Sequence, residues 1–161
     1  MTTSVAPPVT TLTSSTDIRA SADRVWAIIS DLPQMGAYSP ENTGGRWRKG
    51  ATGPALGAVF TGANRRGAHR WSTRVTVVTC EPGLAFAFDV TSVGLPVARW
   101  SYDITPTAEG CTRTETWENR SGALLATLGK LITGESDRVG FTAASLDHTL
   151  AAVKAHAEAS A

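Results

Sequence analysis

The chain has 161 residues, a length typical of one domain and sufficient to bury a hydrophobic core without disulfides or metals. Hydrophobic residues make up 42% of it and charged residues 18%, which excludes wholesale disorder. The 15 basic and 14 acidic residues leave a net charge of +1, so the overall charge gives no argument for nucleic-acid binding.

The N-terminal segment is rich in serine and threonine and lacks the basic start and apolar core of a secretory signal. We expect residues 1–10 to be a flexible leader, residues 11–158 to form a single domain, and the protein to be cytoplasmic. No apolar run reaches the roughly 20 residues that a membrane-spanning helix requires. Cys80 and Cys111 are too few for a disulfide framework or a zinc site, so we expect two reduced thiols.

The first predicted elements are a strand over residues 10–20 and a helix that follows it. Ser21 suits the N-cap of this helix, and Asp23 suits its first turn. Apolar residues then recur at helical spacing until Pro33 ends the helix. A second, shorter helical segment is expected over residues 34–40.

From about residue 42 to residue 119, short β-forming segments alternate with turns that contain Gly or Pro. Pro82 and Gly83, for example, suit the two central positions of a type II turn. Connections this short make consecutive strands antiparallel neighbours. The predicted strands cover residues 43–49, 58–64, 69–80, 85–91, 97–105 and 111–119, which together indicate one curved antiparallel sheet and an α+β fold.

Two helices are predicted after the sheet. Residues 123–132 are apolar and mildly helical, and the glycines around them would let this segment move as a lid. A long terminal helix over residues 136–157 carries a narrow apolar stripe, which consists of Val139, Ala143, Leu146, Leu150, Val153 and Ala157.

The order of these elements and several stretches of sequence resemble one superfamily. The stretches SADRVWAIISDL, RWSTRVTVVTCEPG and LDHTLAAVKAHAE are similar to the START-related, polyketide cyclase/dehydrase and lipid-transport superfamily (SRPBCC), in particular its small actinobacterial-type single-domain members. The similarity covers residues 12–158. It implies a helix-grip fold, in which the curved sheet wraps around the long C-terminal helix and leaves an internal apolar cavity. In that superfamily the cavity usually takes a hydrophobic or amphipathic small molecule.

Alternation along the strands indicates which side chains face such a cavity. The face of residues 97–105 that holds Trp100 and Tyr102 is expected to point inward. Trp117 stays ambiguous, because Arg113 and Glu115 share its face of the last strand. An aromatic stripe is also typical of an ordinary core, and the resemblance is what favours a cavity. The predicted ligand-binding residues are Tyr38, Phe60, Trp71, Thr73, Phe86, Phe88, Trp100, Tyr102, Trp117, Leu128, Ile132, Phe141 and Leu146.

The sequence lacks the common catalytic motifs. It contains no phosphate-binding loop, no dinucleotide-binding glycine pattern and no hydrolase nucleophile elbow. The histidines His69, His148 and His156 do not complete a metal set, and His148 is expected in solvent. We therefore predict no catalytic residue, no metal and no cofactor.

Acid–base chemistry would need a carboxylate inside the apolar concavity. The carboxylates considered are Asp89, Asp103 and Glu115, and alternation along the strands assigns them to the cavity only if the predicted faces are wrong. A binding role is therefore favoured over an enzymatic one.

Seven basic and no acidic residues lie between Asn42 and Cys80. Arg65 and Arg66 fall at a predicted hairpin tip and are expected to stay solvated. The stretch is either a solvated face or a surface that attracts an anionic ligand head group or an anionic membrane. Nucleic acid is not expected, because the aromatic residues are predicted to point inward.

We predict that the protein binds and carries or sequesters a hydrophobic small molecule, lipid or polyketide-like, and that it is a monomer. The first alternative is a cofactor-free polyketide cyclase or dehydratase on the same scaffold. The second alternative is an adaptor that binds a protein partner.

Overall fold

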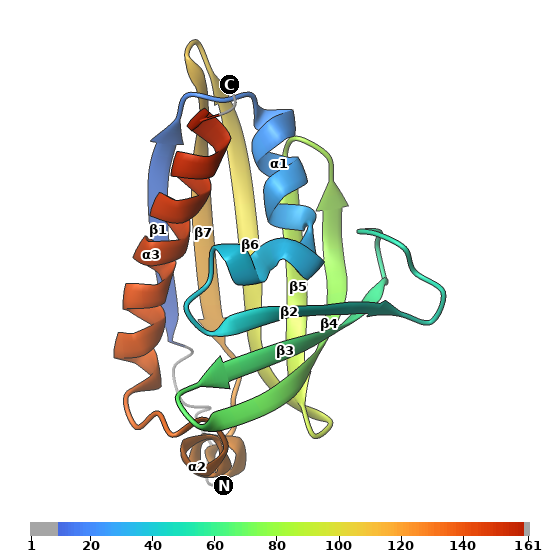
Figure 1. Cartoon of the computed structure of the whole chain (residues 1–161), viewed down its shortest axis with the longest axis vertical. Helices are drawn as coiled ribbons and strands as arrows, with labels where there is room; N and C mark the ends of the chain where they lie inside the picture. The colour runs from blue at the N-terminus through green and yellow to red at the C-terminus, as the bar shows by residue number, and fades with distance from the viewer. Residues whose placement is uncertain (1–9, 160–161) are drawn as a thin grey trace, which may run out of the picture.

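The computed structural model describes residues 10–159, so the predicted leader lies almost entirely outside the described residues. The architecture is α+β with one antiparallel sheet, as the sequence predicted (Figure 1). The sheet has seven strands in the order β1-β7-β6-β5-β4-β3-β2. The strands are β1 (Thr11–Ile18), β2 (Asn42–Arg48), β3 (Val59–Arg66), β4 (His69–Glu81), β5 (Ala85–Ser92), β6 (Leu95–Thr107) and β7 (Gly110–Asn119). The helices are α1 (Ala22–Ser30), the 3-10 helix η1 (Leu32–Ala37), α2 (Ala123–Thr133) and α3 (Arg138–Ala159).

Every neighbouring pair of strands in the sheet is antiparallel, and the first strand closes against the last. Irregularities of register between β4 and β5 and between β5 and β6 bend the sheet, as β-bulges do. Gly45 lets β2 pass closely over β3: a Cβ atom there would lie 2.7 Å from the Phe60 ring. Its φ of +148° also suits glycine alone. The resulting sheet is concave toward the helices (Figure 1).

Helix α1 begins where Ser21 was predicted to cap it, and the Ser21 side chain accepts a hydrogen bond from the backbone N–H of Arg24. Val25 and Ile29 are fully buried against the sheet. The indole N–H of Trp26 donates to the Ala85 carbonyl at 3.0 Å, which ties the helix to β5. Helix α1 ends at Ser30, before Pro33. Pro33 lies in the first turn of η1, which begins at Leu32, two residues before the predicted start of the second helical segment.

Helix α3 runs alongside β1 and also contacts α1 (Figure 1). Its C-terminal half buries Leu150, Val153 and Ala157 as predicted. At its N-terminal end the predicted stripe is wrong, because Val139 is 39% exposed and Thr142 is buried instead. The helix there borders a pocket rather than a packed core.

The hydrophobic core lies between α1, the C-terminal half of α3 and the sheet. The Arg24 side chain closes this end of the molecule by donating to the Ala157 carbonyl at 2.9 Å. His148 is exposed on the outer side of α3, as expected. Within residues 10–159, no helix has the combination of length and apolarity that crossing a bilayer requires.

Candidate ligand-binding site

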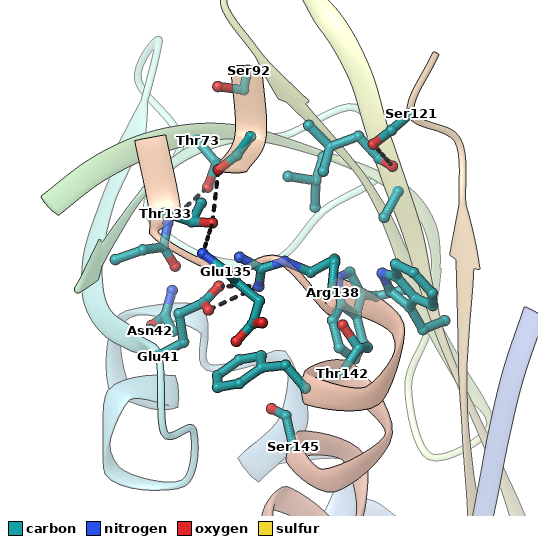
Figure 2. A pocket seen from close by; sticks show the side chains of 18 of the residues that line it. Glu41, Asn42, Thr73, Ser92, Ser121, Thr133, Glu135, Arg138, Thr142 and Ser145 are labelled. Carbon is teal, nitrogen blue, oxygen red and sulfur yellow. Dashed lines mark hydrogen bonds and ion pairs between the residues drawn. The ribbon is translucent and has the colours of Figure 1, made fainter. Parts of the chain in front are cut away.

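A pocket of about 450 Å³ lies between the concave face of the sheet, η1 and the α2–α3 segment. This volume is within the range of small-molecule sites, roughly 300–1,000 Å³. Figure 2 shows polar side chains gathered around it, among them Thr73 of β4, Arg138 of α3 and the loop residues Glu41 and Glu135. Most of the remaining lining is apolar and aromatic.

The sheet builds the inner wall of the pocket from rows of side chains that cross the strands. Phe88 of β5 lies opposite Trp100 of β6, and Trp100 lies opposite Trp117 of β7. In the next row Tyr102 lies opposite Glu115. Side chains directly opposite on one face are in contact range, so each row is a continuous strip of wall.

Most of the predicted ligand-binding residues line this pocket. They are Phe60, Trp71, Thr73, Phe88, Trp100, Tyr102, Trp117, Ile132 and Phe141. The structure also settles the face of Trp117, which alternation left open: its side chain points inward and is buried.

Four predicted residues are not among those that line the pocket. Phe86 is fully buried in the core behind it, stacked on Tyr102 with ring centroids 6.4 Å apart. Leu146 packs with Ala98 and Trp117 between α3 and the sheet. Tyr38 packs edge-on against the His156 ring, and Leu128 is 36% exposed on α2. Packing in the core or exposure to solvent decides these four positions, and strand parity alone could not reveal it.

A buried ion pair lies on β7. Arg113 and Glu115 are 0% and 1% exposed, and the Arg113 Nη2 atom is 2.9 Å from Glu115 Oε2. The Arg113 guanidinium also lies over the Tyr102 ring, 5.2 Å from its centroid. Its Nε and Nη1 atoms have no hydrogen-bond partner among the described residues. Arg113 therefore holds one oxygen of Glu115 while the Glu115 side chain itself lines the pocket.

Burial dominates the electrostatics of this pair. It raises the pKa of Glu115 to about 7, although Arg113 and a hydrogen bond from Tyr102 both act to lower it. Burial first, and then the Glu115 charge, raise the pKa of Tyr102 well above its usual value, so this phenol stays protonated at neutral pH. The Tyr102 hydroxyl thus donates to the Glu115 carboxylate. A carboxylate of this kind can gain and lose its proton near neutral pH.

The expectation that alternation keeps Glu115 out of the cavity is wrong. The outward face of β7 is the threonine face, where Thr114 and Thr116 meet the hydroxyl groups of Ser15 and Thr13 on β1. The signal that could have revealed this was Trp117: once it points inward, Arg113 and Glu115 do too. Opposite charges two residues apart on one strand face can neutralise each other when buried.

The other candidate carboxylates are outside the pocket, as alternation indicated. Asp89 faces away from it and accepts two hydrogen bonds from Arg99, at 2.6 and 2.8 Å. These bonds hold the pKa of Asp89 below its usual value. Asp103 is exposed. Within residues 10–159, no three His, Cys, Asp or Glu side chains are arranged to hold a metal ion.

A cluster of charged residues around the Phe141 ring joins the α2–α3 segment to β3 and to the loop before β2. We call it the rim cluster; it consists of Glu41, Arg66, Glu135, Arg138 and Phe141. Arg66 Nη2 lies 2.5 Å from Glu135 Oε2. Arg138 Nη1 lies 2.8 Å from Glu41 Oε2 (Figure 2). The two guanidinium groups lie 5.1 and 5.3 Å from the centroid of the Phe141 ring. Arg66 is therefore not the solvated hairpin-tip residue that was expected.

Comparison with known proteins agrees with this arrangement. Residues 9–158 match the sequence profile of the family described as polyketide cyclase / dehydrase and lipid transport. The chain belongs to this family. Its fold places it in the SRPBCC superfamily, which confirms the resemblance seen in the sequence. None of the curated proteins compared with the chain matches it.

Three solved structures illustrate the range of similar proteins. The solution structure of a polyketide-cyclase-like protein from Corynebacterium glutamicum is 29% identical, covering 92% of this chain and 91% of that one, with a TM-score of 0.60. The di-domain ARO/CYC of the steffimycin biosynthetic pathway is 16% identical, with a TM-score of 0.72. The match covers 94% of this chain but only 51% of the di-domain protein. The major latex-like protein 151 of Panax ginseng is 13% identical over 92% of this chain and 97% of that one, with a TM-score of 0.68. The latter two likenesses concern the fold.

Proposed function

We propose that the protein binds a hydrophobic or amphipathic small molecule in this pocket and carries or sequesters it. The observation that carries the proposal is the pocket itself, about 450 Å³ and walled by Trp71, Phe88, Trp100 and Trp117. A core that only stabilised the fold would be close-packed, with few voids larger than a water molecule. The family's association with polyketides and lipids supports the same ligand class.

The test is native mass spectrometry of freshly purified protein, followed by extraction and identification of any co-purifying molecule. A parallel titration with fatty acids, isoprenoids and polyaromatic compounds follows tryptophan fluorescence, because three tryptophans line the pocket. Ligand binding should also raise the melting temperature by mass action on the folded state. A protein that is isolated empty and responds to no compound of the panel would favour the adaptor role instead.

A second candidate function, a cofactor-free cyclase or dehydratase, is favoured by Glu115. A carboxyl group with a pKa of about 7 can act as a general acid or base at neutral pH. In this role ionised Glu115 would remove a proton from a carbon next to a carbonyl group and return it to a departing hydroxyl group, which leaves as water. The likeness to the di-domain ARO/CYC of the steffimycin pathway supports this candidate.

The two functions make different predictions for Glu115→Gln. For an enzyme, this variant should abolish turnover of a hydroxyketone substrate while the fold persists and the affinity changes by no more than several-fold. For a carrier, no turnover is expected in either protein. Glu118→Gln is the matched control, since it makes the same chemical change on the same strand outside the pocket-lining residues.

A further inference from the structure

Glu115 introduces a single charged side chain into an aromatic part of the inner wall. Its neighbours along the wall are Tyr102, Trp100 and Trp117, and all four side chains line the pocket. At 1% exposure, Glu115 has almost no access to bulk water. An apolar ligand that filled the pocket would therefore leave any unused hydrogen-bonding capacity of this carboxylate without compensation.

That unused capacity can be counted from the contacts. An ionised carboxylate offers about four acceptor sites on its two oxygens. Arg113 occupies one site on Oε2, at 2.9 Å, and the Tyr102 hydroxyl donates to a second. About two sites remain without a protein donor, and Glu115 is among the residues that line the pocket. Arg113 meanwhile fixes the carboxylate on its far side, so the acceptor position is preorganised.

We infer that Glu115, positioned by Arg113 and Tyr102, is a recognition site for a hydroxyl group of the ligand, whose apolar skeleton packs against Phe88, Trp100 and Trp117. The inference rests on the proposed binding function and defines its ligand class: a hydrophobic molecule that carries a neutral hydrogen-bond donor. A hydrocarbon of the same shape packs against the aromatic wall but donates no hydrogen bond to Glu115. A ligand with a carboxylate at this position meets a like charge once Glu115 is ionised.

The other charged side chains that line the pocket come from α2, the start of α3 and the loops before β2 and between α2 and α3: Glu41, Lys130, Glu135, Asp137 and Arg138. Arg113 lies on the same strand as Glu115, and Tyr102 lies on β6. On the other side, α3 presents the neutral Thr142 and Thr149 to the pocket. Asp147 of α3 is not among the residues that line the pocket; it accepts a hydrogen bond from Ser14 of β1. Since Glu115 changes charge near neutral pH, its hydrogen bond to a ligand hydroxyl should strengthen when it ionises, because hydrogen bonds to charged groups are the stronger kind.

The experiment compares naphthol with methylnaphthalene substituted at the same ring position, titrated by tryptophan fluorescence from pH about 5.5 to about 8.5. The two probes have the same skeleton and nearly the same size, and a phenolic hydroxyl stays mostly protonated over this range. A purely apolar pocket prefers the methyl compound, which is the more hydrophobic. We expect the wild type to prefer naphthol, and the preference to grow by about fivefold as the pH rises.

Variants assign the effect to Glu115. In Glu115→Gln the pH dependence of the preference for naphthol should disappear. The control variants Glu118→Gln and His69→Gln should retain it. His69 is included because its ring borders Gly134, between α2 and α3. If Glu115→Gln does not fold, the comparison of naphthol with methylnaphthalene in the wild type still tests the inference. Equal or tighter binding of methylnaphthalene across the pH range would overturn the inference, and so would an unchanged pH dependence in Glu115→Gln. If neither probe nor the broader panel binds, the proposed binding function fails as well.

Discussion

Replacing Glu115 by Gln should make the stability of the protein less dependent on pH. Gln has nearly the same size and no ionisable proton. The ordinary pKa of a Glu carboxyl is 4.5, and burial raises that of Glu115 to about 7 in the folded protein. Between these values the folded state keeps a proton that the unfolded state has lost. Unfolding then releases a proton, so the free energy of unfolding falls as the pH rises.

The size of this effect follows from the shift. Each pKa unit is worth about 1.4 kcal/mol, so Glu115 should cost the wild type about 3 kcal/mol between pH about 4.5 and about 7. The free energy of unfolding of the wild type minus that of Glu115→Gln should therefore fall by about 3 kcal/mol across this interval. Below pH about 4.5, Glu115 is protonated in both the folded and the unfolded state. The difference in unfolding free energy between the wild type and Glu115→Gln should therefore not change with pH there.

Urea denaturation of both proteins at a series of pH values measures this difference. Arg113→Met is an informative companion, because loss of the counter-charge should extend the pH-dependent interval upward. A difference that stays constant, or that grows in favour of the wild type as the pH rises, would refute the reasoning. A constant difference would mean that the Arg113 charge and the Tyr102 hydrogen bond cancel the effect of burial on the pKa of Glu115, and a growing difference would mean that they outweigh it.

Three further predictions concern the pocket wall, the rim cluster and the basic stretch. Trp71→Ala should weaken binding of an apolar ligand about tenfold or more, with a smaller stability loss than the roughly 3–5 kcal/mol of a fully buried tryptophan. The control Trp26→Ala, which loses its packing on Phe86 in the core, should lower the melting temperature without changing the affinity. In Arg66→Ala/Arg138→Ala, release of a bound ligand, measured by stopped flow, should accelerate several-fold with little loss of stability, because partly exposed ion pairs are worth about 0–1 kcal/mol each. Arg99→Ala, which removes an ion pair on the outer face of the sheet, is the matched control. An unchanged release rate would show that the rim cluster does not restrain the α2–α3 segment. A second hollow, on the outer face of the sheet, is lined by the basic residues Arg48, Lys49 and Arg74. The protein should therefore co-sediment with phosphatidylserine vesicles at low salt, and this binding should be lost at high salt and in Arg48→Glu/Arg74→Glu. No binding at low salt would mean that this basic stretch is only a solvated face.

The sequence was sufficient to predict the order of the elements because the turn residues and the alternation on β4 and β6 are local signals. Ser21 at the helix N-cap and the inward face of Trp100 and Tyr102 depend on few neighbours. The inward face of β7 could not be read in the same way. A face that contains Arg113 and Glu115 is normally solvated, and only their mutual contact and the neighbouring Tyr102 make burial tolerable.

The limits of the site prediction were set by contacts between residues far apart in the chain. Arg66 looks like a hairpin tip until Glu135 and Phe141 are brought against it by the α2–α3 segment. Phe141 falls off the apolar stripe of α3 because two guanidinium groups, rather than the core, cover its ring. Strand parity likewise could not separate Phe86, in the core, from Phe88, in the pocket wall. That distinction depends on where α1 ends and the pocket begins.

The two halves of α3 are held by different forces, and this has a consequence for how the protein can change over evolution or by design. The C-terminal half is embedded in the core through Val153 and Ala157 and is closed by Arg24. The N-terminal half meets the rest of the molecule through Leu146, the rim cluster and the pocket, and the partly exposed ion pairs of the rim cluster contribute little to folding. Substitutions around Val139, Phe141 and Ser145 can therefore reshape ligand selectivity at small cost in stability, whereas the last three turns tolerate only side chains that repack the core.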